Sequence, residues 1–230
     1  MWIYKLERKI PWFRIPNLMF GIVIISGMIY LFDFISAIQR NNVSIYSMIY
    51  FDRNLITQGQ FWRLLSFIFV PPNSSPFFTL LGLYFLYFIG RSLEAVWGEF
   101  KLTLYYFIGI IFCILGGFLV GSTTVIFLNL SLFLAFAATH PDLQILLFFV
   151  IPVKVKWLGY LDAVIFLFSI ISSLLAMNWS NALAAVMAIL NFLIFFGPKF
   201  FSDMFTKLKY WKNRRDFINK TNNSWRNWKE

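Results

Sequence analysis

Few side chains in this 230-residue chain could carry out nucleophilic or acid–base chemistry. The chain has one His, His140, and one Cys, Cys113, so a metal site built from several His or Cys ligands is excluded. Ser131 lies nine residues before His140, and on one helix this spacing places the two side chains on opposite faces and about 13.5 Å apart along the axis. A Ser hydroxyl needs a proton acceptor within hydrogen-bond reach, so the two residues form no catalytic pair on an unbroken helix. Lys154 and Lys156 could serve Ser131 as a base only if burial removed their charge.

Three polar residues inside apolar runs could instead offer hydrogen bonds to a bound segment. Asp33, Asn129 and Ser131 each lie among Phe, Leu and Ile residues, and polar groups at such positions in membrane helices mark functional sites or bonds between helices. The alternatives are structural. Asn129 could join neighbouring helices, and Asp33 could reach the outer interface or pair with Arg40 or Arg63.

The composition is typical of a membrane protein. Hydrophobic residues make up 60% of the chain and charged residues 13%, whereas soluble chains carry about 25% charged residues. Aromatic residues, which belong to this hydrophobic share, make up 21% of the chain, which is more than one soluble core needs. These values argue against a small water-soluble enzyme and against a disordered protein, and they favour an integral membrane protein with several helices.

Runs without charged residues predict an all-α fold: a polytopic membrane protein with a bundle of six helices. A helix needs about 20 residues to cross the ~30 Å hydrocarbon core, so two double-length runs are divided where Gly, Ser and Asn cluster. A short segment at 62–70, before three Pro residues, is expected to precede the second span. The six predicted spans cover residues 18–38, 76–96, 101–120, 124–139, 157–177 and 181–197.

The distribution of basic residues predicts that both termini lie in the cytoplasm. With six spans, 17 of the 20 Lys and Arg residues fall on the side of the termini, and basic residues favour the cytoplasmic side. The chain then divides into a basic cytoplasmic N-terminus (1–16), a six-span membrane domain (17–197) and a basic cytoplasmic tail (198–230). We expect this tail to contact anionic lipids rather than nucleic acid, and Asp162 to anchor the fifth span at the interface near Lys156.

An ordered set of motifs resembles the rhomboid superfamily. Trp62-Arg63 follows the long outer loop, and the second span ends in Gly90-Arg91-Ser92-Leu93-Glu94 followed by Gly98. The stretch Leu83-Tyr84-Phe85-Leu86-Tyr87 is more similar to the Derlin branch of that superfamily. The resemblance covers residues 60–197 and implies the six-span rhomboid-like fold. In that fold it implies structural roles for Trp62, Arg63, Gly90, Arg91, Glu94 and Gly98.

The resemblance also indicates where the catalytic residues of an active rhomboid would stand. Active members carry a Ser within G-x-S-G on the fourth span and a His on the sixth, and neither motif occurs here. Two further catalytic positions, on the second span, would fall near Phe78 and Gly82. All four catalytic positions are therefore expected to be lost.

The resemblance thus implies a rhomboid-fold pseudoprotease, and no metal or cofactor is expected. The many Lys, Asn, Ile and Phe residues fit an AT-rich genome, so we expect the protein in a bacterial plasma membrane. Such a protein would bind transmembrane segments of client membrane proteins, in quality control or extraction, and Asp33, Asn129 and Ser131 would offer hydrogen bonds to them. No Gly follows Gly197, so the ATPase that eukaryotic Derlins recruit through a Gly-containing tail motif is not implied. The alternative is enzymatic: an atypical intramembrane serine protease that uses Ser131.

Overall fold

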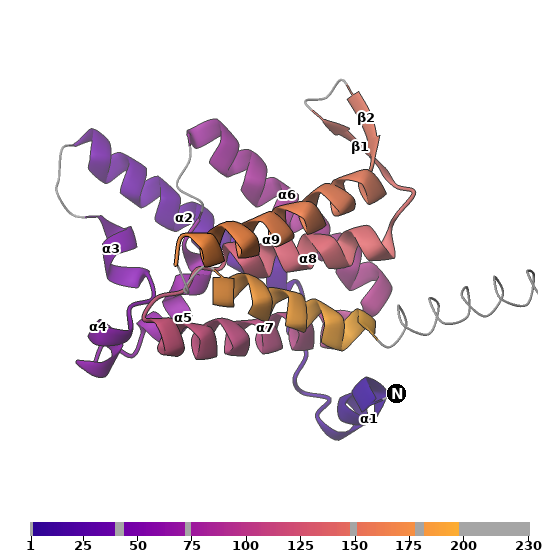
Figure 1. The fold of residues 1–230 in the computed structure, drawn as a ribbon, viewed down its shortest axis with the longest axis horizontal. Helices are drawn as coiled ribbons and strands as arrows, with labels where there is room; N and C mark the ends of the chain where they lie inside the picture. The colour runs from indigo at the N-terminus through magenta and orange to yellow at the C-terminus, as the bar shows by residue number, and fades with distance from the viewer. Residues whose placement is uncertain (1, 40–43, 72–74, 148–150, 178–181, 198–230) are drawn as a thin grey trace, which may run out of the picture. The chain divides into compact units, whose positions relative to one another are not determined.

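The structure, a computed structural model, describes residues 2–39, 44–71, 75–147, 151–177 and 182–197. Two compact units, Met1–Phe192 and Leu193–Glu230, divide the chain, and the contacts discussed below lie within the first. The described chain is mostly helical (Figure 1). The predicted basic tail, 198–230, lies outside the described residues.

Six apolar helices occupy the positions of the six predicted spans. Four of them, each of 21 or 22 residues, are long and apolar enough to cross a membrane: α2 (Leu18–Ile38), α6 (Pro76–Trp97), α7 (Glu99–Val120) and α9 (Val155–Leu175). Two are shorter, namely α8 (Ile126–Thr139) and the helix Ala182–Gly197. The membrane class is therefore confirmed, whereas the count of six full-length spans is not, since four of the described helices reach that length.

Short elements occupy the connections between these helices. α1 (Trp2–Lys9) precedes α2, and four elements lie between α2 and α6: α3 (Ile45–Ile49), α4 (Arg53–Thr57), α5 (Arg63–Ser66) and the 3₁₀ helix η1 (Phe67–Phe69). The predicted segment 62–70 is thus formed by α5 and η1. α3 and α4 lie in the loop that was predicted to be on the outer side, and the name outer loop is used below for its described residues, 44–61.

A β-hairpin corrects the all-α prediction. β1 (Gln144–Leu147) and β2 (Ile151–Lys154) pair in antiparallel fashion between α8 and α9, with Gln144 opposite Lys154. The stretch lies between the predicted fourth and fifth spans, and no strand was predicted there. A run of four to eight apolar residues is typical of a strand but also of a buried helix segment, and the pairing of β1 with β2 decides between the two.

Local signals in the sequence set several helix ends. Pro76 begins α6, where the missing N–H of Pro is not needed by the helix. Asp52 begins α4 by accepting hydrogen bonds from the backbone N–H groups of Asn54 (2.8 Å) and Leu55 (3.2 Å). Gly98 both ends α6 and begins α7 with a φ of 80°, a conformation that strongly favours glycine.

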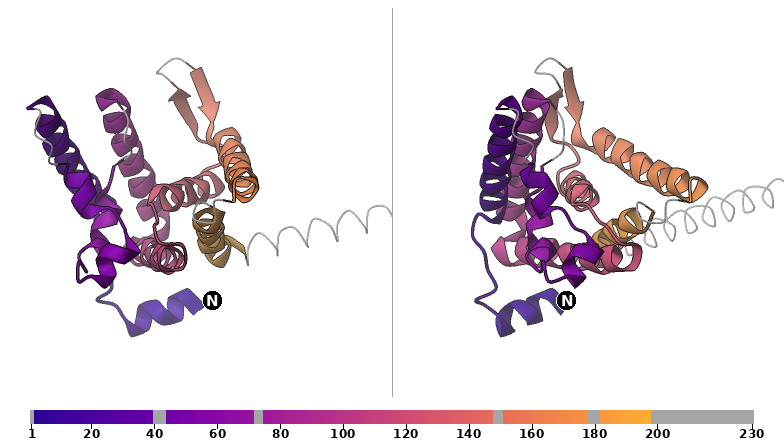
Figure 2. Two further views of the ribbon diagram at one scale, coloured as in Figure 1. Left: turned by 60° about the vertical axis from the view of Figure 1, so that its left-hand side comes forward. Right: turned by 90° about the vertical axis from the view of Figure 1, so that its left-hand side faces the viewer.

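The helices pack closely within the first unit. α6 contacts α2, α7 and α8, and α8 in turn contacts α9 (Figure 2). Gly90 of α6 permits the approach of α2, because a Cβ atom at this position would lie 2.1 Å from Cγ and 2.5 Å from Cβ of Met19. Large apolar side chains remain exposed along α2, α6 and α9, as expected for surfaces that face lipid.

Candidate functional site

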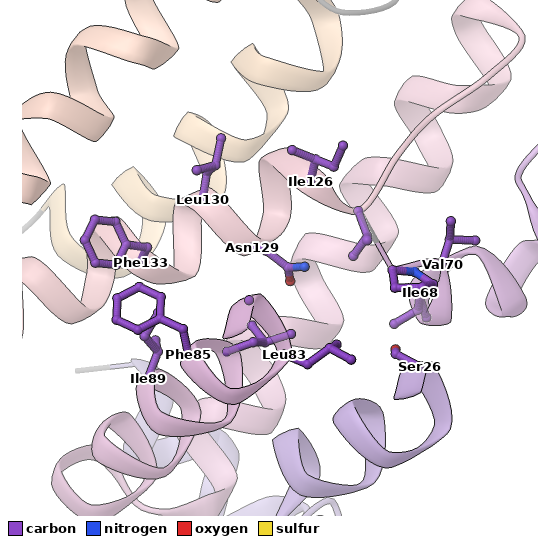
Figure 3. Close-up of a pocket in the computed structure, with 14 residues that line it drawn as sticks. Ser26, Ile68, Val70, Leu83, Phe85, Ile89, Ile126, Asn129, Leu130 and Phe133 are labelled. Atoms are coloured by element: carbon purple, nitrogen blue, oxygen red, sulfur yellow. The ribbon is translucent and has the colours of Figure 1, made fainter. Parts of the chain in front are cut away.

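A pocket lies between α2, η1, α6 and α8, with a volume of about 280 Å³. We refer to it as the apolar pocket. Carbon-rich side chains form most of its wall (Figure 3). The residues that line it are Ser26, Ile68, Val70, Pro71, Gly82, Leu83, Phe85, Leu86, Ile89, Val125, Ile126, Asn129, Leu130 and Phe133.

Helical spacing explains how α6 and α8 line the pocket. Residues three and four apart share one face of a helix, and the lining residues follow this rule at 82, 85, 86 and 89 on α6 and at 126, 129, 130 and 133 on α8. Val70 adopts an extended conformation after η1, as expected for a residue that precedes a Pro. η1 and the residues that follow it therefore close the part of the pocket that the two helices leave open.

Two neutral polar side chains interrupt the apolar wall. Asn129 extends its amide from α8 toward the pocket, and the hydroxyl of Ser26 points into the same space from α2 (Figure 3). The hydroxyl of Tyr106 donates to Oδ1 of Asn129 over 3.5 Å. The amide N–H groups of Asn129 are therefore left for a ligand. None of the lining residues carries an ionisable side chain.

The sequence indicates a functional role more clearly for Asn129 than for Ser26. The sequence analysis selected Asn129, and the structure places it in the pocket wall. It did not select Ser26, because a Ser in a helix commonly bonds to a carbonyl of the preceding turn and so gives a weak signal. Only the packing of α2 against α6 and η1 brings Ser26 to the pocket.

Ser131 lies apart from the pocket. Its side chain is fully buried at 0% exposure, and its Oγ lies 2.5 Å from the hydroxyl of Tyr105 on α7. That Tyr105 hydroxyl also donates to the carbonyl of Ser131 over 2.9 Å. α8 is unbroken up to Thr139, and His140 follows at its end beside Phe136. Ser131 lies within α8 and His140 just beyond its last residue, more than two helical turns further along the chain.

Asp33 lies near the end of α2, where it binds residues of the following loop, and it does not line the apolar pocket. It accepts hydrogen bonds from the hydroxyl of Ser44 (3.0 Å) and from the backbone N–H of Ile45 (2.9 Å). These bonds hold the first turn of α3 against α2. Of the two cations considered as partners of Asp33, Arg63 binds Ser47, Tyr50 and Gln60 instead, and Arg40 lies outside the described residues.

Arg63 fixes the outer loop to α5. The residue is 4% exposed, and its guanidinium donates three hydrogen bonds, to the carbonyls of Tyr50 (2.9 Å) and Ser47 (3.0 Å) and to Oε1 of Gln60 (2.7 Å). Trp62, whose ring is exposed, donates from Nε1 to the carbonyl of Met48 over 3.2 Å. The five fixed donors of a guanidinium suit such an irregular backbone.

The remaining motif residues organise the junction between α6 and α2. Arg91 donates to Oδ1 of Asn17 over 2.9 Å, and Oε1 of Glu94 accepts from the backbone N–H of Asn17 over 3.2 Å. Asn17 immediately precedes α2 and has a φ of 52°. Arg91 and Glu94 therefore both bind Asn17. Together with Gly90 and Gly98, they set how α6 meets its neighbours.

The two positions assigned to lost catalytic residues differ in their surroundings. Phe78 is exposed and does not line the apolar pocket. Gly82 lines it, and a Cβ atom added at Gly82 would meet nothing within 4 Å. Gly82 therefore leaves open space in the wall between α6 and α8.

Asp162 is the clearest departure from a sequence expectation. The residue is 3% exposed, and neither of its carboxyl oxygens has a hydrogen-bond partner in the part of the chain that the structure describes. The predicted anchoring at the interface near Lys156 is therefore wrong, and Lys156 lies over the ring of Trp157 instead. An acidic residue seven positions inside an apolar helix was the signal that could have indicated burial.

Across the described ranges, no group of three or more His, Cys, Asp or Glu side chains could hold a metal ion. No protein-family model matches the chain, and no curated protein or solved structure matches it.

Proposed function

We propose that this protein is a rhomboid-fold pseudoprotease, similar to Derlins, that binds transmembrane segments of client membrane proteins in the apolar pocket. It would act in quality control or extraction of those clients from a bacterial plasma membrane, with both of its termini in the cytoplasm. The observation that carries the proposal is a pocket with an apolar wall and two neutral polar groups, built between helices of membrane-spanning character.

The surroundings of Ser131 support a binding role over a catalytic one. Its hydroxyl contacts the phenol of Tyr105, and a phenol stays protonated at neutral pH and cannot accept the proton of a nucleophile. Ser131 is also fully buried, so a peptide bond has no path to it in this conformation. Neither feature suits the alternative of an intramembrane serine protease.

The position of the pocket supports access from within the membrane. Two of its lining residues, Gly82 and Ile126, are exposed, so the pocket opens at the surface of α6 and α8. α8 has 14 residues, which rise ~21 Å and fall short of the ~30 Å hydrocarbon core. A short helix thins the bilayer around it at modest cost, and a thin bilayer eases the sideways arrival of a segment that bears a polar residue.

Site-specific photo-crosslinking to a defined single-span reporter protein tests the proposal. A photoreactive phenylalanine replaces Ile126 at the rim of the pocket, and a matched control replaces Phe168, an exposed apolar residue of α9 that does not line it. We expect crosslinks from position 126, fewer from position 168, and a loss at 126 when Gly82→Leu fills the pocket. Equal crosslinking from both positions, unaffected by Gly82→Leu, would contradict the proposal.

Labelling by a fluorophosphonate tests the enzymatic alternative. We expect the purified protein to remain unlabelled, because no base stands beside the hydroxyl of Ser131 in the described structure. Labelling that disappears in the Ser131→Ala variant would replace the proposed pseudoprotease with a protease.

A further inference from the structure

The polar groups of the apolar pocket favour a ligand that has hydrogen-bonding atoms as well as apolar surface. Ser26 is 3% exposed, and its hydroxyl points into the pocket (Figure 3). An apolar ligand that covered this hydroxyl would deprive it of a hydrogen-bond partner, which is costly for a polar group. Ser26 therefore favours a ligand that supplies a hydrogen-bond partner.

Asn129 adds hydrogen-bond donors to the pocket. The hydroxyl of Tyr106 occupies its Oδ1, and the two N–H donors of its amide have no partner among the described residues. Asn129 thus presents donors to the pocket. Ser26, as a hydroxyl, can accept as well as donate.

The absence of charge from the wall decides which ligands fit. All 14 lining residues are neutral, so a Lys, Arg, Asp or Glu brought into the pocket would have no counter-charge there and would bear the full cost of burial. An entirely apolar segment would leave Ser26 and Asn129 without partners. A neutral ligand with both an acceptor and a donor avoids both costs.

We propose that the apolar pocket selects transmembrane segments that carry a side-chain carboxamide, Asn or Gln, within an otherwise apolar sequence. This inference rests on the proposed function and names its client class. The carboxamide oxygen accepts from the amide N–H of Asn129, and the carboxamide NH₂ donates to Oγ of Ser26. A Ser or Thr hydroxyl can also donate and accept, but both of its bonds meet at one oxygen, whereas a carboxamide presents its acceptor and its donor on separate atoms that can reach two separate groups.

A series of single-span reporters tests the selectivity. The reporters differ at one central residue, which is Leu, Asn, Gln, Lys or Asp, and all are crosslinked through the photoreactive residue at position 126. We expect the Asn and Gln reporters to crosslink about five-fold more than the Leu reporter for each hydrogen bond formed. The Lys and Asp reporters are expected to crosslink no more than the Leu reporter.

Variants of the pocket assign the preference to the two polar side chains. Ser26→Ala and Asn129→Leu are each expected to reduce the preference for Asn and Gln about five-fold. Ser172→Ala on α9 serves as the matched control, because the Ser172 hydroxyl bonds to the carbonyl of Ser169 and does not line the pocket. Protection of the buried thiol of Cys113 from a maleimide shows that each variant is folded.

The outcomes separate the two proposals. Equal crosslinking of all reporters at position 126 would overturn the carboxamide selectivity and leave the binding of transmembrane segments standing. A preference for the Lys or Asp reporter, or a carboxamide preference that survives both pocket variants, would also overturn the selectivity. A failure of every reporter to crosslink at position 126 would overturn the proposed function as well.

Discussion

The same substitution at two glycines of α6 should have opposite effects on stability. Gly82 and Gly90 are both helical, and replacing Gly by Ala within a helix stabilises it by about 0.5–1 kcal/mol. At Gly82 the new methyl group meets nothing within 4 Å, so Gly82→Ala should show this gain in full. At Gly90 the methyl group collides with Met19 of α2.

The collision at Gly90 cannot be relieved by a change of rotamer alone. The Cβ of Met19 would lie 2.5 Å from the new methyl group, and a Cβ atom is fixed to the backbone of α2. The two helices must therefore separate, and overpacking of this kind costs about 1–3 kcal/mol. Because the gain in helix propensity is common to both variants, the difference between them isolates that cost. For a chain of this size, 1–3 kcal/mol separates the two melting temperatures by about 2–12 °C.

The single buried thiol provides the assay. Cys113 is the one Cys of the chain and is buried, so a maleimide that fluoresces on reaction reports unfolding in detergent at one defined position. We expect the melting temperature to rise slightly for Gly82→Ala and to fall for Gly90→Ala. Equal increases in both variants would refute the close approach of α2 and α6 at Gly90.

Three further predictions use other contacts of the structure. Asp162→Leu removes a buried carboxyl without a described partner and should raise stability by about 1–3 kcal/mol in the same thiol assay. A loss of stability would mean that the carboxyl has a hydrogen-bond partner in the folded protein. Arg63→Lys removes the fixed fork of donors that holds residues 44–61. Limited proteolysis of the purified protein in detergent should therefore cut these residues several-fold faster, and an unchanged rate would contradict the role of the guanidinium. Tyr105→Phe removes the hydroxyl that meets Ser131 and should lower stability by about 0.6–1.7 kcal/mol. Because Ser131→Ala removes part of the same contact, the two substitutions together should cost less stability than the sum of their separate costs. Strict additivity of the two costs would exclude the contact.

The sequence by itself determined where the long apolar helices lie. α2 covers Leu18–Ile38 and α6 covers Pro76–Trp97, within one residue of the predicted spans, because apolar run length, Pro and charge are properties of neighbouring residues. The spacing argument that separates Ser131 from His140 is local in the same way, since it depends only on the pitch of α8. The structural role expected for Arg63 agrees with its contacts to the carbonyls of Tyr50 and Ser47.

Tertiary structure alone decided which of the polar residues meet. Ser26 and Asn129 are far apart along the chain and face one pocket because α2, α6 and α8 pack together. Ser131, two residues after Asn129, turns toward Tyr105 instead, because successive residues of a helix point in different directions. The burial of Asp162 and the pairing of β1 with β2 likewise depend on neighbours that the local sequence does not specify. A helix pattern fixes the element, but the contact between two elements depends on how they pack, and packing is not encoded within either segment alone.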